Sequence, residues 1–195
     1  MIIVLEGIDN CGKNTIAKLL LEKYPDIIKV DFPNYSSPLG KLIKQELLRE
    51  NLPPISLQLL FSSERLSQKD KLIKLSSDNV VLTTRYSYSA IAYGSARGIN
   101  KNLLYLLEEE LPPADLKIFL YISPEESIAR SVSPDIFETD LCFLRSVEHQ
   151  YKEILSNDNT WKVVDATQPI ETVFANVEDI IKDQWRIIEP YGRKT

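Results

Sequence analysis

The sequence predicts a three-layer α/β fold in which a mainly parallel five-stranded sheet is covered by helices on both faces. Short, almost uninterrupted apolar runs alternate with longer helical patterns, as expected where strands are buried on both faces and crossover helices join them. A glycine-containing segment links the first strand to the first helix. With 195 residues and 44% hydrophobic side chains, the chain is expected to form one globular domain, residues 1–195.

Five segments are predicted to be strands because they are short, apolar and rich in β-branched or aromatic residues. They are residues 2–6, 27–32, 80–84, 116–122 and 161–166. In a parallel sheet of this kind, ligands bind beyond the carboxyl ends of the strands. Residues that directly follow these segments are therefore the first candidates for a functional site.

Helical patterns fill the intervals between the predicted strands. They cover residues 14–24, 40–50, 56–75, 87–97, 101–110, 124–131, 139–155 and 170–185. The 56–75 helix follows a pair of prolines, and Ser56 is expected to cap its N-terminus.

Composition excludes several classes of function. A net charge of −5 argues against a protein that coats nucleic acid, which needs a basic surface. The chain has only two cysteines and one histidine, which argues against a disulfide framework and against a zinc centre. No signal peptide and no apolar run of bilayer length is found, so a cytoplasmic protein without a membrane partner is expected.

The segment from Gly7 to Asn14 predicts a phosphate-binding loop. It follows a strand, opens a helix and matches the GxxxxGK[ST] pattern except at its last position. In such loops, backbone N–H groups and a helix N-terminus face phosphate oxygens, and Lys13 would reach the β and γ phosphates. The residues expected to bind ATP here are Gly7, Asn10, Cys11, Gly12, Lys13, Asn14 and Thr15.

Asn14 stands where the pattern requires a hydroxyl that normally binds Mg²⁺. Its amide oxygen is still a neutral hard ligand, so Asn14 is expected to contribute to a metal site, directly or through water. Thr15 offers a hydroxyl one position later.

Four further segments, taken with the loop, make the chain resemble the thymidylate kinase family, which phosphorylates dTMP to dTDP. The matching segments are EGIDNCGKNT (6–15), DFPNYSSPLGKLI (31–43), LLFSSERLSQ (59–68), VVLTTRYSYSAIAYGSARG (80–98) and NTWKVVDATQPIE (159–171). The resemblance implies a P-loop kinase fold, ATP as phosphoryl donor, Mg²⁺, a homodimer and a lid at about 131–144.

The residues also suit this chemistry by themselves. Phe61 and Arg65 lie four positions apart on one predicted helix face, where they could stack on a base and donate to it. An isolated pair of this kind is more often a core phenylalanine and a solvated arginine. Arg85, after the 80–84 strand, could bind an acceptor phosphate or form a surface ion pair.

The resemblance implies specific roles for the site residues. Asp9 would hold the sugar 3′-hydroxyl, Tyr93 would disfavour a 2′-hydroxyl, and Phe61 and Arg65 would contact thymine. The full acceptor set is Asp9, Phe32, Pro33, Tyr35, Phe61, Arg65, Arg85, Ser89, Tyr93, Arg97 and Phe137. Lys13, Arg85, Asp9 and Arg97 would act in catalysis, Arg130, Ala166, Thr167 and Gln168 would flank adenine, and Glu138 would lie near the metal.

Four departures from the family pattern concern phosphate and metal handling. Asn14 replaces the loop hydroxyl, Thr84 replaces the acid of an Asp-Arg-Tyr motif, and Tyr35 occupies a position where many relatives carry arginine. Residues 131–144 contain no Lys or Arg, although relatives take a catalytic arginine from the loop or the lid. Arg130, Arg145 and Lys152, which flank the lid, and Arg97 are possible substitutes.

Two alternatives stay open at this point. A related kinase could accept dUMP or a purine deoxynucleotide, or the chain could bind nucleotides without transferring phosphate. The first is distinguished by comparing acceptors, and the second by nucleotide binding without product formation.

Overall fold

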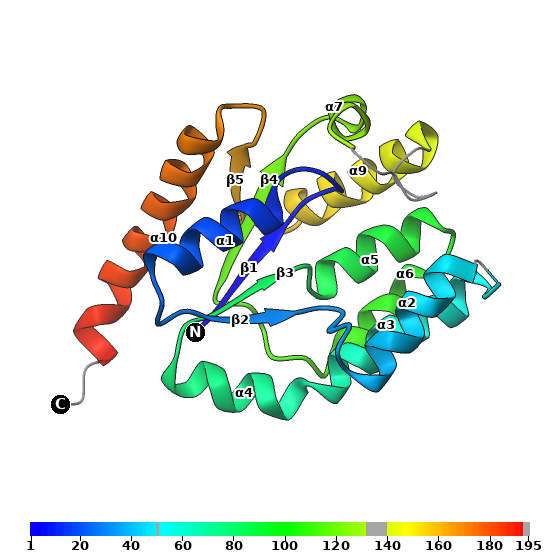
Figure 1. The fold of residues 1–195 in the computed structure, drawn as a ribbon, viewed down its shortest axis with the longest axis horizontal. Coiled ribbons are helices and arrows are strands. Elements are labelled where there is room, and N and C mark those ends of the chain that lie inside the picture. The colour runs from blue at the N-terminus through cyan, green and yellow to red at the C-terminus, as the bar shows by residue number, and fades with distance from the viewer. Residues whose placement is uncertain (50, 132–139, 193–195) are drawn as a thin grey trace.

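The computed structural model describes residues 1–49, 51–131 and 140–192, and the side chains of these segments as far as residue 184. Five parallel strands form one sheet in the order β2-β3-β1-β4-β5 (Figure 1). Their bounds are β1 Ile2–Glu6, β2 Ile28–Asp31, β3 Val81–Thr84, β4 Leu116–Tyr121 and β5 Lys162–Asp165. The predicted fold class is confirmed, and all five predicted strands are present with ends shifted by at most one residue.

The helices begin and end within two residues of the predicted positions, with two exceptions: the helix predicted at 170–185 extends to Gly192, and the helix predicted at 56–75 is divided in two. They are α1 Lys13–Lys23, α2 Pro38–Arg49, α3 Pro54–Ser67, α4 Lys69–Asp78, α5 Ser87–Ala96, α6 Lys101–Glu108, α7 Pro124–Ala129, α9 Leu141–Ser156 and α10 Ile170–Gly192.

The single helix predicted at 56–75 is wrong, because the chain forms two helices that meet at Gln68. Its backbone leaves the helical range there, with φ −100° and ψ 0°. The Gln68 side chain is buried and donates to Glu64 at 2.7 Å, and no glycine or proline marks the break in the sequence. The predicted cap is also wrong: Pro53 is the N-cap, Pro54 occupies the first turn, and Ser56 lies inside the helix.

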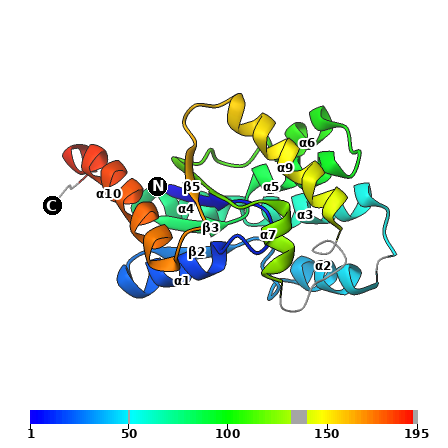
Figure 2. The same cartoon turned by 90° about the horizontal axis from the view of Figure 1, so that it is seen from above.

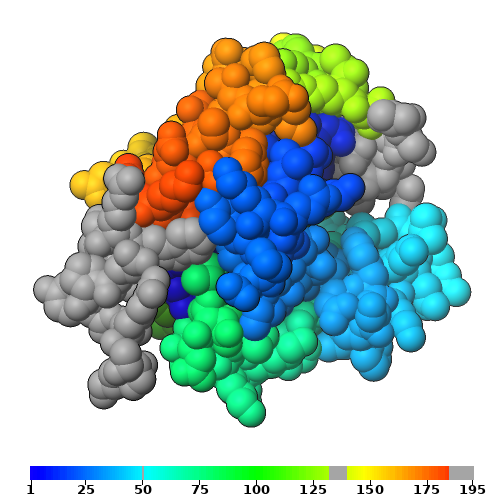
Figure 3. All heavy atoms as spheres, turned by 60° about the vertical axis from the view of Figure 1, so that its left-hand side comes forward, coloured from blue at the N-terminus to red at the C-terminus, as the bar shows by residue number. Residues whose placement is uncertain are grey.

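The helices form a layer on each side of the sheet (Figure 2). Helices α1 and α10 pack together on one face, where Figure 3 shows them side by side. Helices α4, α5 and α9 cover the opposite face. Among the described helices, none combines the length and apolar character needed to cross a bilayer.

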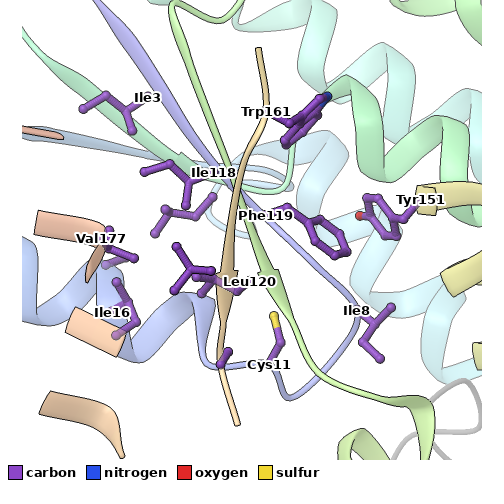
Figure 4. Close-up of a cluster of buried hydrophobic side chains, with 14 of the residues drawn as sticks. Ile3, Ile8, Cys11, Ile16, Ile118, Phe119, Leu120, Tyr151, Trp161 and Val177 are labelled. Atoms are coloured by element: carbon purple, nitrogen blue, oxygen red, sulfur yellow. The ribbon is translucent and has the colours of Figure 1, made fainter. Parts of the chain in front are cut away.

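Strand β4 shows how the core is divided between the two layers (Figure 4). Ile118 and Leu120 point toward α1 and α10, on the side of Val177, whereas Phe119 points toward α9. The ring of Phe119 lies 4.9 Å from that of Tyr151. This alternation buries both faces of the strand, which explains its continuous apolar sequence.

The parallel arrangement places several predicted site segments at one edge of the sheet. Leu5 pairs with Thr84 in the register, and Tyr121 pairs with Asp165. The loop after β1, the Arg85 turn after β3 and the 166–168 segment after β5 therefore emerge on the same side. The predicted lid is described only at its ends: residues 132–139 lie outside the described residues, and 141–144 are the first turn of α9.

Gly40 in α2 yields a stability prediction. A Cβ atom at this position would lie 1.9 Å from the carbonyl oxygen of Asn34. Gly→Ala in a helix ordinarily stabilises by up to about 1 kcal/mol, but here we expect Gly40→Ala to lower the unfolding free energy by about 1–3 kcal/mol. Urea denaturation measures the change, and the exposed Lys44→Ala should stay within about 0.5 kcal/mol. A stabilised Gly40→Ala chain would contradict the prediction.

Candidate functional site

The loop between β1 and α1 has the backbone geometry of an anion cradle. Gly7, Asn10 and Gly12 all have positive φ angles, of 146°, 57° and 94°. A Cβ atom at Gly7 would lie 2.5 Å from the carbonyl oxygen of Leu120, so the loop needs glycine there. The loop ends at the N-terminus of α1, where free backbone N–H groups favour an anion.

The side chain of Lys13 folds back across this loop. Its ammonium donates to the carbonyl oxygens of Gly7 at 2.8 Å and Ile8 at 2.7 Å. Cys11 packs its thiol into the hydrophobic core, with 2% of the residue exposed (Figure 4). Of the predicted loop contacts, Cys11 can therefore offer a ligand its backbone N–H but not its side chain.

Helix α7 fixes the loop from the other side. The hydroxyl of Ser127, which is fully buried, donates to the carbonyl oxygen of Asp9 at 2.8 Å. The side-chain amide of Asn10 donates to the carbonyl oxygen of Ser127 at 3.3 Å. The sequence offered no signal for Ser127, because a serine within a short helix is common on protein surfaces.

A cavity of about 690 Å³ opens beside the loop. Four cationic and two anionic side chains line it, which suits an anionic ligand. The lining residues are Asp9, Asn10, Gly12, Lys13, Asn14, Thr15, Lys29, Asp31, Phe32, Pro33, Asn34, Tyr35, Ser36, Thr84, Arg85 and Arg130. Eleven of the residues expected from the sequence are therefore brought together around one space.

Asp9 and Arg85 form an ion pair at the cavity wall. The Asp9 carboxylate also accepts a hydrogen bond from the Tyr93 hydroxyl at 2.6 Å, and the Arg85 guanidinium lies over the Tyr93 ring. Burial opposes ionisation of Asp9, but Arg85 and Lys13 outweigh it and hold the pKa of Asp9 below its usual value. Burial and the Asp9 carboxylate raise the pKa of Tyr93, so its hydroxyl stays a donor.

Glu6, at the end of β1, is a buried carboxylate that sequence analysis missed. Glu6 is fully buried, and four donors form hydrogen bonds to its carboxylate. The N–H groups of Tyr86 and Ser89 donate to Oε1 at 2.7 and 3.2 Å, and the hydroxyls of Ser89 and Tyr151 donate to Oε2 at 2.6 and 2.8 Å. A charged residue closing an otherwise apolar strand was the available signal.

These bonds hold the turn that carries Arg85. The Arg85 backbone is left-handed, with φ 70°, a conformation that costs a non-glycine residue about 1–3 kcal/mol. Glu6 binds the backbone N–H of the next residue, Tyr86, and so caps α5 where no side chain of the preceding turn does. The Ser89 hydroxyl, predicted to lie near the base, is bound to Glu6 and Tyr151 instead.

Phe61 and Arg65 lie on α3 and are not among the residues that line the cavity. The Arg65 guanidinium is buried and donates through Nε and Nη2 to Glu108 on α6, at 2.8 and 2.6 Å. Glu108 also accepts from Ser62 at 2.6 Å. Sequence analysis predicted a solvated or base-binding arginine and did not identify Glu108, because the partner is 43 residues away.

The remaining predicted residues fall into three groups. Phe32 is buried against Tyr86 and lines the cavity, as do Tyr35 and Pro33, which a cis peptide bond joins to Phe32. The Arg97 guanidinium lies 4.9 Å from the centre of the Phe143 ring. Phe137 and Glu138 lie outside the described residues.

Arg130 joins the cavity to the segment after β5. Its guanidinium donates to the carbonyl oxygen of Ala166 at 3.0 Å and to Glu126 at 3.1 Å. Thr167 and Gln168 are held by hydrogen bonds to Asp165. The residues expected to flank adenine thus lie together beside the loop.

The donor set at the cavity determines which metal could bind. No cluster of three His, Cys, Asp or Glu side chains occurs in the part of the chain that the structure describes. Asn14 and Thr84 instead offer neutral oxygen atoms, which are hard ligands that Mg²⁺ accepts when phosphates and water complete its shell. The residues present therefore fit Mg²⁺ held together with a phosphate ligand.

Removing the Glu6 carboxylate tests its structural role. Glu6→Ala would leave four donors without their acceptor, and we expect the unfolding free energy to fall by about 3 kcal/mol or more. Glu6→Gln should cost about 1 kcal/mol, because its amide oxygen can still accept from the two backbone N–H groups. Urea denaturation of both variants provides the measurement, and equal losses would contradict the assignment.

The lowered pKa of Asp9 predicts a pH dependence of stability. A carboxylate whose pKa is depressed in the folded state contributes stability above its usual value of 3.8, and loses it as pH falls through the folded value. The difference in unfolding free energy between the native chain and Asp9→Asn should therefore be constant between pH 5 and 8 and shrink below about pH 4. A difference that shrinks at pH 6 would contradict a depressed pKa.

Comparisons with known proteins agree with this geometry. The family model described as thymidylate kinase matches residues 5–177. The chain is 37% identical to a thymidylate kinase of Prochlorococcus marinus, covering 92% of this chain and 94% of that protein, and 30% identical to one of Dictyostelium discoideum, covering 97% and 88%. A solved thymidylate kinase structure from Candida albicans superposes with a TM-score of 0.81 at 29% identity, covering 93% and 91% of the two chains. The chain belongs to the thymidylate kinase family.

Proposed function

We propose that this protein is a thymidylate kinase that transfers the γ-phosphoryl group of ATP to dTMP, giving dTDP and ADP. The observation that carries the proposal is that Lys13 of the phosphate loop and Arg85 after β3 line the same cavity. One cation is placed for the donor phosphates and the other for the acceptor phosphate. A phosphoryl group can pass between them without leaving the cavity.

On the donor side, the loop N–H groups and Lys13 would bind the β and γ phosphates of ATP. Lys13 now satisfies its ammonium with two loop carbonyls. ATP binding would replace at least one of these contacts by a phosphate oxygen, a stronger, charge-assisted partner. The 166–168 segment would flank the adenine ring.

On the acceptor side, Arg85 would hold the dTMP phosphate while Asp9 positions the guanidinium. Arg85 uses Nη2 to bind Asp9, so its other N–H groups can donate to a phosphate. The depressed pKa keeps Asp9 ionised and able to accept from the sugar 3′-hydroxyl. The acceptor phosphate is itself the nucleophile, so no general base is needed, and catalysis consists of positioning and charge neutralisation.

Asn14 and Thr84 would hold Mg²⁺ at the donor phosphates, directly or through water. When bound, the ion neutralises charge on the transferred phosphoryl group. Glu138, outside the described residues, stays a predicted neighbour of the metal.

Arg130 is the strongest candidate to replace the arginine that relatives take from the loop or lid. Of the cations flanking the predicted lid, Arg145 pairs with Glu125 at 2.6 Å and Lys152 pairs with Glu148 at 2.7 Å. Arg130 also pairs with Glu126, at 3.1 Å, but unlike Arg145 and Lys152 it is among the described residues that line the cavity. A cation contributing to the transition state is worth roughly 10³–10⁵ in rate.

A broader acceptor specificity is the second candidate function. Arg65, expected to read the base, gives two of its donor positions to the buried carboxylate of Glu108. Fewer free donors weaken discrimination between pyrimidine bases. The relative from Candida albicans is described as having broad substrate specificity.

A homodimer and a cytoplasmic location are further proposals, which rest on the family. Exposed leucines on α2 and α3, including Leu42, Leu48 and Leu59, provide an apolar surface that pairing could cover. Leu57, on the opposite side of α3, is buried in the chain itself.

An acceptor comparison tests the proposed function. In a coupled ADP-release assay we expect dTMP to give the highest kcat/KM, above dUMP, dGMP and the ribonucleotide that carries thymine on a ribose sugar. Tyr93→Phe, which deletes the hydroxyl bound to Asp9, should lower kcat/KM for dTMP by about 10-fold, the equivalent of one hydrogen bond to a charged group. ADP release must be matched by dTDP, since ATP binding without dTDP formation would leave only a nucleotide-binding protein.

A further inference from the structure

Two of the departures from the family pattern contact each other. The hydroxyl of Thr84, at the end of β3, donates to the amide oxygen of Asn14, in the first turn of α1, at 3.3 Å. The two residues are 70 positions apart, and both line the cavity. Thr84 is buried, whereas Asn14 is exposed.

The chemical groups at these two positions are exchanged relative to the usual arrangement. In P-loop enzymes a Ser or Thr hydroxyl of the loop and an Asp carboxylate from a strand hold Mg²⁺ together. Here the loop side, at Asn14, carries the carbonyl-type oxygen and the strand side, at Thr84, carries the hydroxyl. Both oxygen types are retained, and one negative charge is lost.

We infer that Asn14 and Thr84 are a matched pair that brings no carboxylate to the metal–nucleotide site, so that nucleotide affinity depends only weakly on Mg²⁺. The inference deepens the proposed function and rests on the same cavity. Asn14 and Thr84 must then be treated as one unit, since a change at either side leaves the other without its complementary group.

Charge in the cavity supports the weak dependence on metal. The two carboxylates that line it each have a cationic partner: Asp9 pairs with Arg85, and Asp31 pairs with Lys29 at 2.6 Å. No further acidic side chain lines this cavity among the described residues. A cavity of this kind attracts Mg²⁺ weakly and does not repel the phosphates of metal-free ATP.

Calorimetry with a non-hydrolysable ATP analogue tests the inference, because it reports binding without turnover. The measured quantity is the ratio of the Kd in EDTA to the Kd in excess Mg²⁺. We expect a ratio below about 3 for the native chain, and at least about 10-fold higher for Asn14→Ser/Thr84→Asp, which restores the usual pair.

Two controls separate pairing from charge. Asn14→Ser/Thr84→Asn keeps the pair uncharged but returns the hydroxyl to the loop side, and it should retain the native ratio. Ser36→Asp adds a carboxylate to the same cavity without an Asn14 partner, and it should raise the ratio far less than the charged double variant.

The single variants complete a double-mutant cycle. Each variant changes the Kd ratio by a factor relative to the native chain. The factor for Asn14→Ser/Thr84→Asp should exceed the product of the factors for the two single variants by at least about fivefold. If the two single substitutions changed the Kd ratio independently, or if the native chain had a Kd ratio of several tens, the inference would be overturned while the proposed function stayed intact. A native chain that binds no nucleotide would overturn both, and one that binds with the expected coupling but forms no dTDP would overturn the proposed function alone.

Discussion

The site depends on one buried carboxylate, Glu6, which connects three parts of the fold. It ends β1 and accepts hydrogen bonds from two backbone N–H groups at the start of α5. It also accepts a hydrogen bond from the hydroxyl of Tyr151 on α9. An unpaired buried charge would be costly, so the four donors must stay in place, and the Arg85 turn stays with them. The positions of the phosphate loop and of Arg85 are therefore set by the same residue.

From this junction the cavity acquires two distinct sides. The loop side presents N–H groups and a lysine whose ammonium donates to two loop carbonyls, and these contacts hold the shape of the loop. The opposite side presents Arg85, held by Asp9 and stacked on Tyr93. Preorganised charges of this kind supply most of the catalysis that phosphoryl transfer requires, because little covalent chemistry is left to the protein.

Local sequence patterns predicted most of the fold but few of the long-range contacts. The strands and the phosphate loop follow from apolar runs and glycine spacing, whereas no glycine or proline marks the break between α3 and α4 at Gln68. Arg65 and Ser89 were placed on the correct helices, yet their side chains meet Glu108 and Glu6. Helical spacing predicts which face a side chain occupies, but not which buried charge it meets there.

By itself the sequence determined the parallel sheet, the phosphate loop and the edge of the sheet where ligands bind, because these depend on periodicity and on residues close together in the chain. It also revealed Asn14 and Thr84 as two separate departures. Only the tertiary structure decided that they contact each other, that Glu6 anchors the Arg85 turn and that Arg65 is committed to Glu108. Each of these contacts joins residues more than 40 positions apart, and the packing of the helices on the sheet brings them together.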